Sequence, residues 1–299
     1  MEILVIGATG FIGAELTAFA RHAGHHVLGC GRGGWEEKAA SLFPDRADYW
    51  SLADGELPGE MLDRADCLVL LAARRPYAGF CFDDYANNVA LARRYMALAM
   101  DHGLGNFVFA SSKAVYSGGD MPWREDRACV PSSLYGASKL ASEQLGLLYS
   151  AGDMLHFKGL RFAQVIGAGE RKGYLINTLM DNARAGKTQT VFGTGEQRRQ
   201  YVYVKDVCAA ILAAAERPEL TGVFNIAMPG SVSNLELAEA VNEAFGNDGN
   251  LRHDFSRPMV GADDEMDVTR AAEVLHFRAS YTIRETFADL AGMAGREHE

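Results

Sequence analysis

The chain has few of the groups that bind metal ions or cross-link a secreted fold. Its five cysteines are isolated from one another, none forms a C-x-x-C pair, and an odd number argues against a disulfide framework. Most lie in apolar surroundings, so we expect buried, reduced thiols at Cys30, Cys67, Cys81, Cys129 and Cys208. The eight histidines have no metal-ligand spacing. We therefore expect a cytoplasmic protein without a bound metal.

Long apolar runs and dense clusters of basic residues are absent as well. No run of about twenty apolar residues occurs, which argues against a membrane-spanning helix. The first residues, MEILVIGATG, begin a strand at once and lack a basic leader, so we expect no signal peptide. With a net charge of −10 and no Lys/Arg-rich stretch, a nucleic-acid partner is not expected. An anionic small ligand stays open, because a few local arginines are enough to bind one.

Short apolar runs alternate with helical patterns through the first half of the 299 residues. The runs predict strands at 2–6, 25–30, 67–73, 106–112 and 155–163. The segments between them have helical periodicity, most clearly at 84–102 and 134–150. Strands that alternate with helices form βαβ units, so we predict a Rossmann-type, doubly wound α/β fold with a parallel sheet covered on both faces.

A glycine-rich turn, GATGFIG, joins the first predicted strand to the first helix. Gly7, Gly10 and Gly13 allow the backbone to turn tightly and to approach a pyrophosphate at the helix N-terminus. A glycine triplet alone is weak evidence, but this strand–turn–helix setting predicts a dinucleotide site. The second strand ends in CGRGG, with Arg32 where NAD enzymes usually have a carboxylate. A guanidinium suits the 2′-phosphate of NADP, although an arginine that stacks on the adenine of either cofactor is the alternative.

The pattern becomes less regular after residue 165, and the earlier alternation returns with a helix at 206–216 and a strand at 223–227. We predict that residues 1–165, completed by 201–227, form a dinucleotide-binding domain. Residues 166–200 and 228–299 then form a smaller α/β C-terminal domain, which would bind the substrate.

The stretch SLYGASKLASE places Tyr135 and Lys139 four residues apart, on the same face of a predicted helix. An ammonium beside a phenol favours the phenolate and makes the tyrosine a usable acid/base. A packed tyrosine and a solvated lysine that share a helix by coincidence are the alternative, so the pair by itself decides nothing.

Three segments together resemble the extended short-chain dehydrogenase/reductase family, and within it the nucleotide-sugar epimerases and dehydratases. They are GATGFIG at 7–13, SSKAVY at 111–116 and YGASK at 135–139. The resemblance continues over nearly the whole chain, through LLAAR at 70–74, NNV at 87–89, LRFAQVIGAG at 160–169, GTGEQRRQYVYVKDV at 193–207 and SRP at 256–258. These motifs together are specific for the family, but they are less specific for a particular substrate.

The resemblance implies roles for particular residues. Tyr135 matches the acid/base, and Lys139 matches its partner, which binds the nicotinamide ribose and lowers the phenol pKa from about 10 towards neutrality. Ser112 matches the catalytic Ser or Thr, with Ser111 as the weaker candidate. For Asn88, a cofactor-binding role and a polar residue near a helix start are equal alternatives. The implied cofactor-binding residues are Gly7, Gly10, Phe11, Ile12, Gly13, Arg32, Ala72, Ala73, Asn88, Tyr135 and Lys139.

The resemblance also implies a nucleotide-diphosphate sugar as substrate. Arg199 and Arg257 match positions that grip the diphosphate, where guanidinium contacts to phosphate are bidentate. The alternative for each of these arginines is a surface position with no role in substrate binding. Gln164 stands where many such enzymes have Asn, and Gln200 replaces the usual Asp, so the sugar and the nucleotide stay open. The predicted substrate-binding residues are Ser112, Gln164, Arg199 and Arg257.

Two enzyme functions fit these residues. In an epimerase acting at C4, Tyr135 removes a proton from a sugar hydroxyl while hydride passes to the nicotinamide, and Ser112 hydrogen-bonds the same oxygen. The keto-sugar then turns over and receives hydride on its other face. The alternative is an NADPH-dependent reductase or dehydrogenase of a keto-sugar or related carbonyl compound. Arg32 favours NADP, whereas the epimerase interpretation favours NAD.

Other functions fit less well. The dehydratases of this family have an acidic pair directly after the catalytic Thr, but here Lys113 and Ala114 occupy those positions. A non-catalytic dinucleotide sensor is a remote third hypothesis, since it would not need the Ser–Tyr–Lys set. The helices at 84–102 and 134–150 resemble a pair that packs across a two-fold axis in this family. We therefore expect a homodimer, unless the chain's own core uses their apolar residues.

Overall fold

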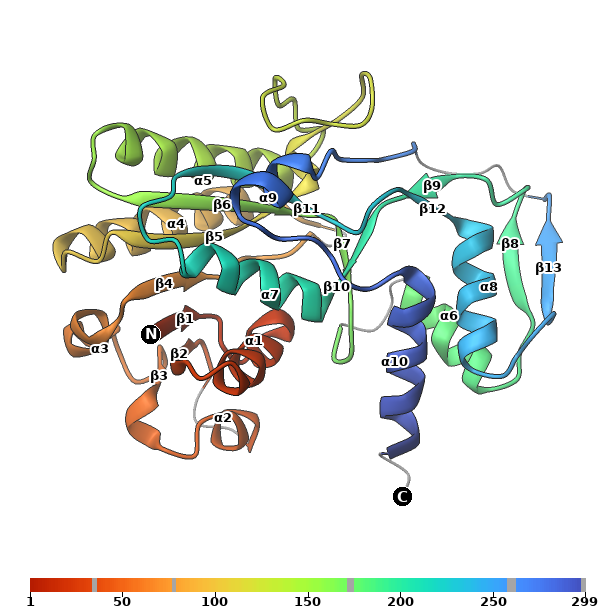
Figure 1. Cartoon of the computed structure of the whole chain (residues 1–299), viewed down its shortest axis with the longest axis horizontal. Coiled ribbons are helices and arrows are strands. Elements are labelled where there is room, and N and C mark those ends of the chain that lie inside the picture. Colours follow the sequence, from red (N-terminus) through yellow and green to blue (C-terminus); the bar gives the residue numbers. More distant parts are fainter. Residues whose placement is uncertain (34–36, 77–78, 171–174, 257–261, 297–299) are drawn as a thin grey trace.

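The structure is a computed structural model, and it describes residues 1–33, 37–76, 79–170, 175–256 and 262–296. Within these residues the centre is a seven-stranded parallel sheet in the order β11-β6-β5-β4-β1-β2-β3 (Figure 1). Its strands are β1 (Glu2–Ile6), β2 (His26–Gly31), β3 (Tyr49–Ser51), β4 (Cys67–Leu70), β5 (Asn106–Ser112), β6 (His156–Phe162) and β11 (Gly222–Ile226). The order reverses between β1 and β4, which is the arrangement of a doubly wound sheet. The predicted fold class is confirmed.

Helices cover both faces of the sheet (Figure 1). On one face lie α4 (Phe82–Asp101) and α5 (Leu134–Ala151), and on the other α1 (Phe11–His22) and α7 (Val204–Ala215). Side chains alternate along β1, so Ile3 and Val5 pack with α1 and α7, whereas Leu4 and Ile6 pack with α4. A strand covered on both sides has no polar face, which explains its continuous apolar sequence.

Short elements between β2 and β4 are not indicated by the sequence pattern. They are α2 (Glu37–Leu42), the 3-10 helix η1 (Arg46–Asp48), β3 and α3 (Gly59–Arg64). A helix of six residues makes fewer than two turns, which is too short for a recognisable amphipathic period. Across the described part of the chain, no helix has both the length and the apolar composition needed to cross a bilayer.

A third apolar cluster lies apart from the sheet, towards the right of Figure 1. It contains three helices, α6 (Leu175–Arg184), α8 (Asn234–Ala244) and α10 (Ile283–Arg296). Three two-stranded sheets accompany them: β10 (Tyr201–Tyr203) with β7 (Gln164–Ile166), β12 (Val232–Ser233) with β9 (Arg198–Arg199), and β13 (Leu251–Asp254) with β8 (Gln189–Phe192). The chain returns from this region to the main sheet, where β11 pairs with β6. The predicted domain boundaries at 165, 200 and 227 stay a prediction.

The remaining short helices are η2 (Lys113–Val115) and α9 (Thr269–Val274).

Three cysteines, Cys30, Cys67 and Cys208, are buried as predicted, and Cys129 is partly buried. The prediction is wrong for Cys81, which is exposed. Cys81 caps the start of α4: its backbone N–H lies 3.1 Å and its Sγ 3.6 Å from Oδ2 of Asp84. A helix cap lies at the surface end of its helix, so the apolar neighbours of Cys81 in sequence do not indicate burial.

Candidate active site

A cleft of about 1170 Å³ opens along the carboxyl ends of the central strands. This is the edge at which open parallel sheets bind their ligands. The cleft is lined by every predicted site residue that the structure describes, namely Gly7, Gly10, Phe11, Ile12, Gly13, Arg32, Ala72, Ala73, Asn88, Ser112, Tyr135, Lys139, Gln164 and Arg199. Arg257 lies outside the described residues. Residues predicted separately are therefore brought together in one place.

The glycine turn forms one wall of the cleft. Gly7 has a φ of +98°, in the left-handed region that favours glycine. A Cβ at Gly13 would lie 2.2 Å from the carbonyl oxygen of Gly7, so only glycine lets α1 start this close to the turn. Gly10 is the N-cap of α1, and no side chain caps it. The first N–H groups of α1 and the positive end of its dipole are thus available to a pyrophosphate.

Most of the charged side chains that line the cleft are cations, although the protein has a net charge of −10. Among the described lining residues one is acidic, Glu170, and the cations are Arg32, Arg74, Arg75, Arg94, Lys113, Lys139 and Arg199. Cations gathered in a concave site focus the field there and attract anions even to an acidic protein. The cleft therefore suits an anionic ligand such as a diphosphate.

Helix α5 carries Tyr135 and Lys139 over the end of β5. The helix begins after Ser133, whose Oγ accepts a hydrogen bond of 3.1 Å from the N–H of Gly136. A Cβ at Gly136 would lie 2.0 Å from the carbonyl oxygen of Ala114, so glycine allows the first turn of α5 to rest directly on η2. Ser112 is the last residue of β5 and the N-cap of η2. This contact brings the start of α5 to the strand end that holds Ser112.

The ammonium of Lys139 is buried beneath the Tyr135 ring. Lys139 is 4% exposed, and its Nζ donates a 2.6 Å hydrogen bond to the carbonyl of Ala110. Nζ lies 5.8 Å from the centroid of the Tyr135 ring and 4.6 Å from that of Phe109. Burial lowers the pKa of Lys139 from 10.5 to about 8, and the charge of Glu143 opposes this effect. A cation in this position favours the phenolate form of a tyrosine.

Phe80 also contacts the predicted acid/base. Its ring meets that of Tyr135 edge to face, with centroids 6.0 Å apart and planes at 89°. Tyr135 is half-buried as a result of its position between this ring and the cleft. The sequence alone does not indicate this contact, because Phe80 precedes a different helix.

Asn88 fixes the segment that leaves β4. Its Oδ1 accepts a 2.7 Å hydrogen bond from the N–H of Arg74, and its Nδ2 donates to the Arg74 carbonyl at 3.0 Å and to Ser138 Oγ at 3.3 Å. Ser138 in turn donates to the carbonyl of Tyr135. Asn88 is buried in the interior of α4, so the alternative of a residue at the helix start is wrong.

Arg199 reaches the cleft from β9, and its neighbour Arg198 does not. The Nε of Arg199 is buried and has no hydrogen-bond partner among the described residues. Arg198 instead contacts Ser231, with Nε 3.2 Å from Oγ, and Glu236, with Nη2 3.1 Å from Oε2. Adjacent residues of an extended segment face opposite sides, as predicted for this pair.

Lys113, the residue after Ser112, is bound to a carboxylate. Its Nζ lies 2.6 and 2.7 Å from the two oxygens of Asp264, and the N–H of Gln200 donates to the same group at 2.9 Å. Burial lowers the pKa of Lys113, Asp264 opposes this effect, and Arg199 adds to it. Gln200 is buried, and its side chain binds backbone groups of Met228 and Met266. A cation therefore stands where the resemblance noted above implies an acid in a dehydratase.

Two charged lining residues, Arg75 and Glu170, are not among the site residues predicted from the sequence. Both line the cleft, and Glu170 Oε1 lies 3.3 Å from Nη2 of Arg75. The Glu170 side chain is 4% exposed, and its Oε2 has no partner among the described residues. Burial raises the pKa of Glu170, and Arg75 opposes the shift. The sequence feature that could have indicated Glu170 is its place in GAGER, a glycine-rich loop that directly follows a strand.

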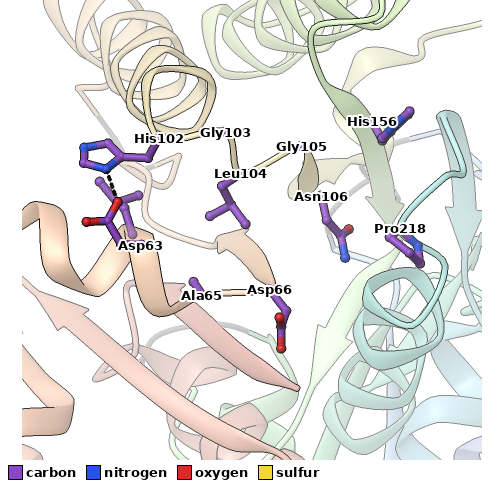
Figure 2. Close-up of a pocket in the computed structure, with 11 residues that line it drawn as sticks. Asp63, Ala65, Asp66, His102, Gly103, Leu104, Gly105, Asn106, His156 and Pro218 are labelled. Carbon is purple, nitrogen blue, oxygen red and sulfur yellow. Dashed lines mark hydrogen bonds and ion pairs between the residues drawn. The ribbon is translucent and has the colours of Figure 1, made fainter.

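A second, smaller cavity of about 420 Å³ lies at the opposite edge of the sheet (Figure 2). Its walls include Asn106, which begins β5, and His156, which begins β6. The ring of His102 faces Asp63, with Nδ1 2.6 Å from Oδ1. Because parallel sheets bind ligands at the carboxyl ends of their strands, we assign the active site to the first cleft. Within the described ranges, no group of three or more potential metal ligands occurs.

The doubly wound sheet, the glycine turn and the buried lysine under a tyrosine define a dinucleotide-binding α/β protein. The model of the NAD dependent epimerase/dehydratase family matches residues 3–227, and the chain belongs to this family. The predicted membership is confirmed.

Individual relatives match over nearly their full length. An uncharacterised UDP-glucose epimerase of Bacillus subtilis is 28% identical over 303 residues, and the match covers 95% of each chain. Among solved structures, UDP-N-acetylglucosamine 4-epimerase from Bacillus cereus has a TM-score of 0.85 and 27% identity, covering 98% of this chain and 96% of the other. MoeE5 in complex with UDP-glucose and NAD has a TM-score of 0.83 and 28% identity, covering 100% of both chains.

Proposed function

We propose that the protein is a nucleotide-sugar 4-epimerase that uses a bound NAD. The observation that carries the proposal is that Ser112, Tyr135 and Lys139 line the same cleft as the glycine turn. Its similarity to a UDP-N-acetylglucosamine 4-epimerase and to MoeE5 with UDP-glucose and NAD supports the substrate class and the cofactor.

The chemistry follows from the three side chains. Tyr135 accepts the proton of the sugar C4 hydroxyl in the oxidation half and returns it in the reduction half. Ser112 donates a hydrogen bond to the same oxygen and stabilises the charge that develops on it. Lys139, held by the carbonyl of Ala110, supplies the positive charge that favours the phenolate. When bound, NAD supplies the hydride acceptor and donor for the two halves.

The substrate's diphosphate is assigned to Arg199. Its buried Nε lacks a partner among the described residues, and a guanidinium can bind phosphate oxygens in pairs. Gln164, at the start of β7, is assigned to the sugar, because it lines the same cleft as Tyr135 and Ser112. Arg257 is predicted from the sequence to bind the diphosphate together with Arg199, and this role stays a prediction.

A second candidate function is an NADPH-dependent reductase or dehydrogenase of a keto-sugar or related carbonyl compound. It is favoured by Arg32, which lines the cleft just after β2. The described lining residues near it, Cys30, Gly31, Gly33 and Leu52, include no carboxylate that would repel a 2′-phosphate. NAD in the MoeE5 complex favours the epimerase instead.

Cofactor identity separates the two functions. We expect purified protein to release NAD when denatured, because an epimerase must retain its cofactor through both half-reactions. The released nucleotide is identified by chromatography and mass spectrometry. An empty site that binds NADPH more tightly than NAD in calorimetry would favour the reductase.

Tyr135→Phe removes the proton acceptor and keeps the ring that packs on Phe80. We expect turnover to fall at least about a hundredfold, because a positioned acid/base contributes on that order. Cofactor affinity, measured by calorimetry, should stay within about twofold. Undiminished turnover in this variant would contradict the assignment of Tyr135.

Arg199→Ala should raise the KM for the nucleotide sugar about tenfold or more, since it removes a charge from the diphosphate site. Arg198→Ala is the matched control: it deletes the neighbouring guanidinium, which faces Ser231 and Glu236. Steady-state kinetics should therefore give a nearly unchanged KM for the control. Equal values for both variants would remove Arg199 from the diphosphate site.

We also propose a homodimer in the cytoplasm. The five free cysteines support a reducing compartment. The helix pair α4–α5 keeps large apolar side chains at the surface, with Phe82 70% and Leu148 67% exposed. Sedimentation should give twice the chain mass of 32.5 kDa. Phe82→Asp should shift the sample towards the monomer. The control is Phe255→Asp, at a similarly exposed site that follows β13, and it should leave the dimer intact. A monomer in every sample would refute the dimer.

A further inference from the structure

A buried ionic pair lies directly behind the predicted acid/base site. Glu143 is 0% exposed, and Arg161, on β6, is 2% exposed. Glu143 follows Lys139 by four residues and Tyr135 by eight, so the three side chains share one stripe of α5. Neither Glu143 nor Arg161 lines the cleft, and neither is given a role by the chemistry proposed above.

The carboxylate of Glu143 is held from two sides. Ser111 Oγ donates to its Oε1 at 2.5 Å. Arg161 Nε lies 3.0 and 3.2 Å from the two oxygens, and Nη2 donates to Oε2 at 2.7 Å. These contacts come from two neighbouring strands, β5 and β6, and leave the carboxylate a single orientation.

Ser111 links this carboxylate to the acid/base site. In β5 it lies between Ala110, whose carbonyl accepts the hydrogen bond of Lys139, and Ser112. A displacement of β5 at Ser111 would therefore move the acceptor of Lys139 and the predicted catalytic hydroxyl together. Both serines line the cleft, but Ser111 donates its hydroxyl hydrogen to Glu143, whereas Ser112 Oγ accepts the N–H of Ala114 at 3.2 Å. This difference favours Ser112 for the proposed role.

The charges around Lys139 depend on the same carboxylate. The groups that face Lys139 are the Tyr135 phenol and Glu143 on its own helix, the Ala110 carbonyl and the Phe109 ring on β5, and Arg161 behind Glu143 on β6. Without Glu143 the two buried cations, Lys139 and Arg161, would lose the carboxylate that pairs with Arg161 and whose charge acts on Lys139, which is strongly unfavourable. Glu143 is also the group whose charge raises the pKa of Lys139 against the effect of burial.

We propose that Glu143 is a positioning residue of this site: its carboxylate keeps the buried ammonium of Lys139 charged and fixes β5 at Ser111. The proposal rests on the proposed function in naming Tyr135 and Ser112 as the groups that are served. A merely structural ion pair would stabilise the fold without changing the titration of Lys139.

The titration of Lys139 can be measured without any substrate. The chain has only seven lysines, so ¹³Cε-lysine labelling of the full protein as purified gives few NMR signals. The Lys139 signal is the one that Lys139→Arg removes. Glu143→Gln keeps the shape of the side chain and deletes its charge. We expect the acid dissociation constant of Lys139 to rise at least about tenfold, because an opposite charge nearby shifts a pKa by about one or more.

Two further variants keep the test decisive. If Glu143→Gln does not fold, because Arg161 is left buried and unpaired, the double variant Glu143→Gln, Arg161→Met removes both charges. Its Lys139 dissociation constant should still rise several-fold. The matched control is Glu125→Gln, a partly buried carboxylate of the same region that accepts the N–H of Asn225 at 2.8 Å. That control should leave Lys139 unchanged. An unchanged titration in a folded Glu143 variant overturns the proposal.

Activity gives a separate readout. A rate that needs charged Lys139 falls as the pH rises through its pKa, so Glu143→Gln should move the alkaline fall of kcat to lower pH. Glu125→Gln should not. If no nucleotide sugar is turned over by the unmodified protein, the proposed function fails while the lysine titration still decides the role of Glu143.

Discussion

A positive charge buried between a strand and a helix is the constraint on which the cleft depends. An ammonium is costly to bury unless hydrogen bonds and opposite charge compensate for the lost water. For Lys139 the compensation comes from the carbonyl of Ala110, the faces of two aromatic rings and the charge of Glu143. Each of these groups must keep its place for the ammonium to stay, so the end of β5 and the first turns of α5 are held as a unit. The unit puts a tyrosine and a serine at the edge of the sheet where ligands bind.

Close backbone contact is the second requirement, and glycine meets it twice. Gly13 lets α1 begin against the turn after β1, and Gly136 lets α5 begin against η2. In both places a Cβ would overlap a backbone carbonyl, which cannot move aside as a side chain can. One contact leaves the first N–H groups of α1 without a side-chain cap, and the other brings Tyr135 to the strand end with Ser112. The starts of both helices thus line one cleft.

Electrostatics within the cleft differ from those of the molecule as a whole. Arginines and lysines meet there from the segments after β2 and β4 and from α4, η2, α5 and β9, whereas most of the acidic residues lie elsewhere. Some of these cations are neutralised locally, as Lys113 is by Asp264. The nearby Arg199 keeps a buried nitrogen without a partner among the described residues, which is a reason to assign the anion to it. Overall acidity and anion binding are therefore compatible.

The sequence by itself determined the fold class, the glycine turn and the Tyr–Lys pair, because these are local patterns of a few adjacent residues or of one helical period. Family membership followed from the same short segments. Only the tertiary structure shows that Ser111 is engaged by Glu143, 32 residues away, which is a reason to prefer Ser112 for the proposed role. It likewise decided the partner of Lys113, 151 residues distant, and that of Arg75, 95 residues distant. Side chains that meet across neighbouring strands are separated by whole βαβ units in the chain. The local periodicity of the sequence therefore does not predict which of them will be in contact.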